Sequence, residues 1–306
     1  LSWPNQEKTR RALESLELLV VIDPMLSATA RHAHYVIGPR LGFESPAITF
    51  GNEGITVYGL SLGYPEPYAQ YQPALIEPPA GSDVLEDWRI FFELGRHMGL
   101  PLAFRGQPFD MASPPTTDQL LEAFVAKSRV PLEEIKRHPH GAIFPDPKPL
   151  ADPKPPDWPH RLQLAATSMM RELTAVAAAL PIAAEQIDRD YPWLLVTRRE
   201  HAVYNSVGQR LPALRKRLSH NPAYVHPEDA DALGLLDDMP IEIESRHGRT
   251  RARVRLADDI RRGVISLAHG FEDANPAALI DDASSFDALS GLPRMSAIPV
   301  RILRAG

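Results

Sequence analysis

The stretch from Pro222 to Gly270 constrains the fold of this chain more than any other. Apolar and polar residues alternate with a period of two over residues 240–245 and again over 252–256, a pattern typical of half-buried strands. His247-Gly248-Arg249 between them predicts a hairpin turn, since glycine tolerates the positive φ that such turns need. The run 263–269 predicts a further strand. We therefore expect a β-rich unit to which the rest of the chain leads.

Composition excludes several classes of protein. A chain of 306 residues is long enough for two domains and a sizeable core. A formal net charge of −6 argues against a general nucleic-acid binder, which needs a basic face. No apolar run approaches the roughly 20 residues that a membrane-spanning helix needs. Because the chain has no cysteine, it supplies no disulfide, no thiolate metal ligand and no iron–sulfur ligand.

Two features concern the organisation of the chain. The first residue, Leu1, is not a methionine, and no signal pattern follows it, so we expect a longer protein of which this is a part. The chain has 31 prolines, and eight of them cluster over residues 139–159. Proline cannot donate to a helix or a sheet, so this cluster predicts an extended surface connection between domains.

The N-terminal part has a strand–helix–strand pattern. A helix over 7–16 precedes the apolar run 18–22, which is typical of a strand buried on both faces of a parallel sheet. Ser27 is placed to cap a short helix over 28–33, and a second strand is expected over 35–37. Ligands of parallel sheets bind beyond the carboxyl ends of the strands. Asp23 lies at such an end, and its equally weighted alternative is a plain turn residue before a proline.

The middle of the chain is expected to be mainly helical. The segment 82–98 predicts a helix capped by Asp83, with a core stripe of Val84, Trp88, Phe91 and Met98. Further helices are expected over 117–126, from Pro131 onward and over 161–180, with a hairpin near 55–60. His138-Pro139-His140 is interpreted as an exposed loop rather than a metal site, since proline keeps it extended and no carboxylate stands at ligand spacing.

Two polar loops at strand ends are the candidate ligand sites of the last part. A strand over 191–197 is followed by the polar residues 198–206, and the strand over 263–269 is followed by residues 270–275. Arginine in such a loop offers planar donors for a phosphate or a base edge. The basic run 209–217 is better explained as a solvated helix face. Residues 297–302 predict a final strand.

Five segments together carry a family resemblance: 18–30, 78–99, 197–206, 221–248 and 275–293. They include Asp87-Trp88 in the second segment and His226-Pro-Glu-Asp-Ala230 in the fourth. These motifs resemble the C-terminal part of the molybdopterin oxidoreductases, relatives of dimethyl sulfoxide reductase, formate dehydrogenase and the molybdenum nitrate reductases. The fourth segment is the most specific.

The resemblance implies an α/β fold, with a Rossmann-like parallel-sheet segment followed by a six-stranded double-psi β-barrel domain. Residues 1–110 would complete the Rossmann-like cofactor-binding domain. Residues 111–189 would form a helical and proline-rich connection. Residues 190–306 would form the molybdopterin-dinucleotide-binding barrel.

The resemblance also implies a cofactor, bis(molybdopterin guanine dinucleotide) holding molybdenum or tungsten. Asp23 and Thr29 would lie near a guanosine. The pterin or the diphosphate would be held by the two loops of the barrel domain, through Thr197, Arg198, Arg199, Asn205, Ser206, His269 and Asn275.

Three positions depart from the family pattern. His34 stands where the family has an acidic residue, Met295-Ser296 replaces an aromatic–lysine pair that contacts the cofactor, and Asp237-Asp-Met-Pro240 replaces a glycine-containing loop. In the family, the metal ligand and the 4Fe-4S cysteines belong to the N-terminal half. We therefore expect no catalytic residue and no metal ligand in this chain.

The expected function is to hold the pterin dinucleotide for two-electron redox chemistry on a small substrate, as part of an oxidoreductase. The expected partners are the cofactor, the N-terminal part of the same protein and an electron-transfer subunit, without nucleic acid or a membrane span. A cytoplasmic location is expected, with the periplasm as the alternative. The alternative function is a cofactor-free scaffold of the same fold, as in the large subunit of respiratory complex I.

Overall fold

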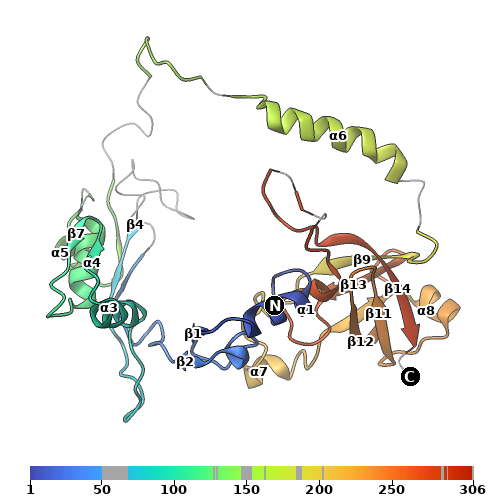
Figure 1. Ribbon diagram of the computed structural model, residues 1–306, viewed down its shortest axis with the longest axis horizontal. Helices are drawn as coiled ribbons and strands as arrows, with labels where there is room; N and C mark the ends of the chain where they lie inside the picture. Colours follow the sequence, from blue (N-terminus) through green and yellow to red (C-terminus); the bar gives the residue numbers. More distant parts are fainter. Residues whose placement is uncertain are drawn as a thin grey trace. The chain divides into compact units, whose positions relative to one another are not determined.

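The computed structural model describes residues 1–49, 68–126, 128, 130–145, 154–161, 163–183, 188–201, 203–283, 286–287 and 289–304. The chain divides into two compact units (Figure 1), one of Leu1–Leu19 with Leu162–Gly306 and one of Val20–Arg161. The hairpin expected near 55–60 lies outside the described residues. The domain boundaries expected at 110 and 189 stay predictions.

The first unit contains a closed barrel, whose strands run in the order β10-β12-β11-β14-β9-β13. The strands are β9 (Trp193–Arg198), β10 (Pro222–Val225), β11 (Pro240–Glu244), β12 (Arg249–Leu256), β13 (Val264–Ala268) and β14 (Ser296–Arg304). Two pairs are parallel, β10 with β12 and β13 with β9, and the other pairs are antiparallel. This mixed six-stranded barrel confirms the expected fold class and is consistent with a double-psi barrel.

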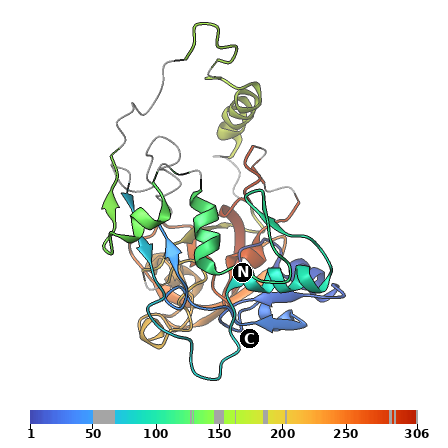
Figure 2. The ribbon, with the colours of Figure 1, turned by 90° about the vertical axis from the view of Figure 1, so that its left-hand side faces the viewer.

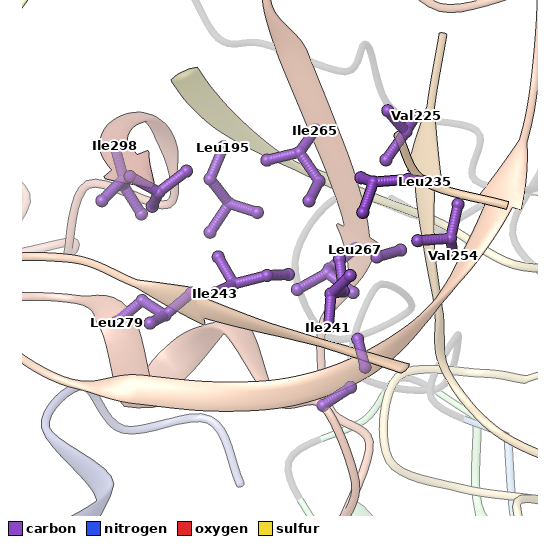
Figure 3. Close-up of a cluster of buried hydrophobic side chains, with 14 of the residues drawn as sticks. Leu195, Val225, Leu235, Ile241, Ile243, Val254, Ile265, Leu267, Leu279 and Ile298 are labelled. Carbon is purple, nitrogen blue, oxygen red and sulfur yellow. The ribbon is translucent and has the colours of Figure 1, made fainter. Parts of the chain in front are cut away.

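The barrel core is aliphatic. Side chains from different strands point toward one another inside the barrel (Figure 3), and Leu195, Ile241, Ile243, Ile265 and Leu267 are fully buried. Each contributes about 1.5–3 kcal/mol by leaving water. The period-two pattern is confirmed at β11, where two isoleucines face inward on either side of an outward glutamate.

In the turn between β11 and β12, the reason for the glycine differs from the expected one. Gly248 does not have a positive φ. A Cβ at this position would lie 2.2 Å from the carbonyl oxygen of Ala278, which belongs to the 3-10 helix η2 (Pro276–Leu279). Ser245 completes the turn, because its Oγ donates to the Leu279 carbonyl at 2.8 Å and accepts from the Gly248 N–H at 3.3 Å. Glycine is therefore needed here for close backbone approach.

Helix α1 (Gln6–Glu14) is anchored beside η2 in the same unit. Asn5 caps the helix by accepting from the Lys8 N–H at 3.2 Å, and its own N–H donates to the Ile280 carbonyl at 3.1 Å. Asp282 then accepts from Asn5 Nδ2 at 2.9 Å and from Lys8 Nζ at 2.5 Å. The other helices of this unit are α6 (Thr167–Ala183), α7 (Pro212–Arg215) and α8 (Pro227–Leu233).

The second unit opens with the expected parallel pair, β1 (Val20–Ile22) and β2 (Tyr35–Ile37). The 3-10 helix η1 (Ala30–His32) lies between them, and Ser27 Oγ accepts from the Ala30 N–H at 3.3 Å. The prediction that β1 is buried on both faces was wrong, because Val20 is 42% exposed. In the described chain these two strands form a sheet of their own, so β1 has no strand beside it other than β2.

Helix α3 (Asp87–His97) starts later than expected. Asp83 does not cap it, because the chain is still extended at Leu85, which bridges to Pro39. The core stripe is also rotated from the expected one, with Phe92 buried while Phe91 and Met98 are 59% and 62% exposed. Leu102 packs directly over Gly95, and this contact favours the observed face.

Among its described residues, the rest of the second unit contains helices α4 and α5 and several short strands. Helix α4 (Thr117–Val125) has a capping box formed by Thr116 and Gln119, and α5 (Leu132–Lys136) begins after Pro131 as expected. Both lie beside the short strands (Figure 2), and α5 contacts β5. The short strands are β3 (Ala47–Ile48), β4 (Tyr68–Ala69), β5 (Tyr71–Gln72), β6 (Ala103–Phe104), β7 (Gln107–Pro108) and β8 (Ala142–Ile143).

The described residues lack two features. No group of three or more potential metal-ligating side chains occurs among them, the His138 to His140 segment included. None of the helices in those ranges combines the length and apolar composition that crossing a bilayer requires.

Candidate functional site

Two loops leave the same end of the barrel from neighbouring strands. We call residues 199–206, after β9, the first loop, and residues 269–275, after β13, the second loop. The strands are parallel, with Ala268 opposite Arg198. Because parallel neighbours end at the same edge, the loops start side by side, in the position where ligands bind to parallel strands.

Three of the expected site residues converge between these loops. Arg199 Nη1 donates to Asn205 Oδ1 and lies 3.0 Å from His269 Nε2. His269 Nε2 lies 3.2 Å from Asn205 Oδ1. We call Arg199, Asn205 and His269 the site triangle. Both arginine contacts use Nη1, and a guanidinium carries five N–H donors in a planar fork, which suits carboxylate, phosphate or carbonyl oxygens.

Partial burial and the nearby charge of Arg199 both favour the neutral form of His269. Partial burial lowers the pKa of His269 most, the nearby charge of Arg199 lowers it further, and a hydrogen bond to the Arg198 backbone acts in the opposite direction. A neutral imidazole has one nitrogen that accepts. Nε2 can therefore accept from Arg199, and the arginine keeps its charge for an anionic ligand.

The backbone of both loops is tightly turned. Asn205 has a φ of 54° and Gly270 a φ of 82°. A Cβ on Gly270 would lie 2.9 Å from both the C and O atoms of Asn205, so the two loops touch backbone to backbone. Non-glycine residues in the left-handed region are uncommon and cluster at functional sites.

Other expected residues of the first loop lie around the site triangle. Thr197 is half-buried at the end of β9, opposite Leu267. Arg198 stacks 3.8 Å from the centre of the Tyr224 ring and pairs with Glu200 at 3.3 Å. Its guanidinium is thus directed toward β10. Ser206 is exposed in the loop.

Asn275 is buried, with 6% of its surface exposed, and makes structural hydrogen bonds. Its Oδ1 accepts from the Ala277 N–H at 3.0 Å at the start of η2, and its Nδ2 donates to the Leu1 carbonyl at 2.9 Å. The structure therefore places Asn275 at the base of the second loop, outside the site triangle.

Asp23 and Thr29 belong to the other unit. Asp23 Oδ1 accepts from the Met25 N–H at 2.9 Å, the geometry of a turn, which was the alternative interpretation of this residue. Thr29 is exposed at the start of η1 and makes no side-chain capping bond. The guanosine contacts of both residues stay predictions.

Two residues that shape the site were missed by the sequence analysis. Asn221 is fully buried and holds the second loop at both ends, donating to the carbonyls of Ala268 at 2.7 Å and Ala274 at 3.0 Å. Gln209 contacts both loops through backbone groups. The only local signal for Asn221 is a polar residue directly before a buried strand, and Gln209 stood inside a run interpreted as a solvated helix face.

The donors of the site fit a pterin dinucleotide. Such a molecule presents a diphosphate and a heterocycle edge with acceptors and donors. The site triangle offers an exposed cationic fork, an amide and a partly buried imidazole. The residues present are therefore chemically suited to this group.

Residues 193–299 match the family described as Molydopterin dinucleotide binding domain. This range runs from the start of β9 into β14 and contains both loops. The barrel with its two loops is thus a molybdopterin dinucleotide binding domain. The matched part of the chain is thus similar to the molybdopterin oxidoreductases, and the match extends over residues 193–299.

Relatives cover almost the whole chain. The F420-dependent formate dehydrogenase subunit alpha of Methanocaldococcus jannaschii is 24% identical over 317 residues, spanning 99% of this chain and 42% of the relative. The assimilatory nitrate reductase catalytic subunit of Bacillus subtilis is 22% identical, spanning 99% of this chain and 40% of its own length. Acetylene hydratase from Pelobacter acetylenicus has the same fold, with a TM-score of 0.73 at 19% identity over 99% of this chain and 42% of its own.

Proposed function

We propose that this chain holds the pterin dinucleotide of a molybdenum or tungsten bis(molybdopterin guanine dinucleotide) oxidoreductase that acts on a small substrate. The observation that carries the proposal is the site triangle, Arg199, Asn205 and His269, at the carboxyl ends of two neighbouring parallel strands. It lies inside the matched domain, on the two loops where the chain presents charge and amide groups together.

Each residue of the site has a role in this proposal. Arg199 donates to diphosphate or pterin oxygens, and Asn205 and His269 hold its guanidinium in place while offering an amide and an imidazole edge. The hydroxyls of Thr197 and Ser206 and the loop N–H groups add further donors, as anion-binding loops do. Arg198 and Asn275 stabilise the starting and closing residues of the loops through their contacts with the barrel unit. Asp23 and Thr29 are proposed to contact a guanosine.

The chemistry of the reaction is supplied by the cofactor when it is bound, and the chain binds, orients and shields it. We propose no catalytic residue in this chain. The names of the formate dehydrogenase and nitrate reductase relatives favour redox chemistry. Acetylene hydratase is named for a hydration, so the shared fold by itself does not select the reaction. An iron–sulfur cluster and an electron-transfer subunit are proposed for the whole protein.

Substitution of Arg199 tests the proposal. Arg199→Met keeps an unbranched, flexible side chain and removes the cationic donors. Because a hydrogen bond to a charged group contributes about 1.5–3 kcal/mol, we expect guanine nucleotide retention in the full-length protein to fall roughly tenfold or more. The measurement is nucleotide released on denaturation after extensive dialysis.

The matched control is Arg251→Met, which changes an arginine on β12 that is paired only loosely with Glu242, at 3.6 Å. This variant should retain the nucleotide like the wild type. Equal retention by both variants and the wild type contradicts the proposed role of the site triangle.

A further inference from the structure

One glutamine side chain joins the two loops of the site. Gln209 Nε2 donates to the Gly270 carbonyl at 2.6 Å and to the Ser206 carbonyl at 3.2 Å, and its Oε1 accepts from the Glu272 N–H at 3.2 Å. A primary amide offers two donor hydrogens and one acceptor oxygen. Both hydrogens and the oxygen are therefore engaged by backbone groups, on the first loop and on the second.

The two loops are held in different ways. The second loop is fixed to the barrel by buried Asn221, which bonds Ala268 and Ala274 and whose N–H donates to Asp273 Oδ2 at 3.0 Å. The first loop is anchored at its start, where Glu200 accepts from the Tyr224 hydroxyl of β10 at 2.9 Å, and its end is closed by the bridge between Tyr204 and Val207, the residue after the loop. These contacts fix each loop by itself, but they do not fix the position of the first loop relative to the second. Gln209 acts on this position directly, since its partners lie on both.

We propose that Gln209 is a positioning residue that fixes the first loop against the second, so that Arg199 and Asn205 meet His269 before a ligand binds. This inference rests on the proposed function, because it assigns the prearranged triangle to a pterin dinucleotide arm. A site whose groups are already in place loses less freedom on binding. Gly270 takes part by allowing the backbone contact that Gln209 secures.

The neighbouring residue provides a matched control. Arg210 pairs with Glu272 at 2.5 Å and so also joins the two sides, but both side chains are about one third exposed, at 31% and 34%. Exposed ion pairs contribute little in water. The partner of Arg210, Glu272, does not belong to the site triangle. Gln209→Met and Arg210→Met therefore replace adjacent residues by the same apolar side chain, and only the first should disturb the site.

The experiment compares four forms of the full-length protein: wild type, Gln209→Met, Arg210→Met and Arg199→Met. Two quantities are measured. The first is the rate at which diethyl pyrocarbonate modifies His269 as a function of pH, mapped by mass spectrometry on protein freed of nucleotide, which gives the titration of this one histidine. The second is the guanine nucleotide retained after dialysis.

In Gln209→Met we expect the titration of His269 to move up toward the ordinary histidine value of about 6.5, since Arg199 is no longer held against the ring. Nucleotide retention should fall about tenfold, the effect of losing two or three hydrogen bonds. Arg210→Met should match the wild type in both measurements. If Gln209→Met does not fold, Gln209→Asn, which keeps the amide but is too short to reach both loops, should show the same two changes.

The outcomes separate this inference from the proposed function. An unchanged His269 titration in a folded Gln209 variant overturns the positioning role, even if that variant loses nucleotide. If Arg210→Met changes the His269 titration and the nucleotide retention as much as Gln209→Met does, the positioning role is also overturned. Any loosening of the loops would then be enough to produce both changes. A shifted titration with full nucleotide retention in both Gln209→Met and Arg199→Met supports the positioning role but contradicts the proposed function.

Discussion

Arg199 obtains its position from contacts distant in sequence. Its partners, Asn205 and His269, stand on different loops, and the ring of His269 accepts because its pKa is held below the ordinary value. The same argument gives the pH response of the site. Below the lowered pKa, the ring gains a second N–H and repels Arg199, so the site triangle opens only in acid.

This response leads to a prediction for stability. Because the folded-state pKa of His269 is depressed, its neutral form contributes stability above the unfolded value, and that contribution is lost as the pH falls through the folded pKa. His269→Gln removes the titration and keeps a side chain that can accept from Arg199. The difference in unfolding free energy between wild type and variant should therefore change only on the acid side of about pH 6.5. Chemical denaturation at a series of pH values measures it, and a difference that varies above pH 7 contradicts the assignment.

Gly248 provides a second test at the scale of one residue. Gly248→Ala places a methyl group 2.2 Å from the Ala278 carbonyl, and neither the turn nor η2 can withdraw without breaking the Ser245 hydrogen bonds. We expect destabilisation of about 1–3 kcal/mol in chemical denaturation, typical of overpacking. Gly42→Ala is the control, since nothing lies within 4 Å of the added atom and its φ is not positive. Similar stabilities for the two variants would show that the backbone contact is not close.

At the scale of elements, the attachment of α1 depends on Asp282. This carboxylate accepts from Lys8 and Asn5, and these hydrogen bonds hold its pKa below the ordinary value. Asp282→Asn should increase deuterium exchange in α1 at neutral pH. Because the depressed pKa means that the stabilisation is lost as the pH falls through it, wild type and variant should converge in acid. Identical exchange of α1 at neutral pH would show that the anchor contributes nothing.

How far the sequence predicts these elements depends on the range of the interactions. Period-two alternation predicted β11 and β12, because each strand carries its own pattern of inward and outward residues. The predicted start of α3 was wrong, because the observed start depends on a bridge between Leu85 and Pro39 that no local pattern reveals. A local pattern gives the strand but not its partners.

The residues of the site also divide into those that the sequence predicted and those that only the structure reveals. Polar residues after strands and the family resemblance together pointed to Arg199, Asn205 and His269, which the structure brings together. Gln209 and Asn221 were missed because their side chains bond to backbone groups, and most of these lie 47 to 63 residues away, at the end of β13 and in the second loop. Backbone groups carry no sequence signature, so a residue that positions a loop through them is visible only in three dimensions.

For the molecule as a whole, the comparisons show that the chain spans 40–42% of the length of the relatives that it matches. The barrel domain carries the family assignment, and its site fits the cofactor chemically. The departures at His34 and Ser296 do not alter the site triangle, because neither residue belongs to it. Retention of the cofactor is thus the point at which the account and a cofactor-free scaffold differ.

The most direct measurement is the metal, pterin and guanine nucleotide content of the purified full-length protein. We predict molybdenum or tungsten together with guanine nucleotide at about two nucleotides per metal, the ratio of a bis(pterin dinucleotide) cofactor. Protein that is folded, and that contains neither the metals nor the nucleotide after expression in cells able to make the cofactor, would contradict it and establish the scaffold alternative.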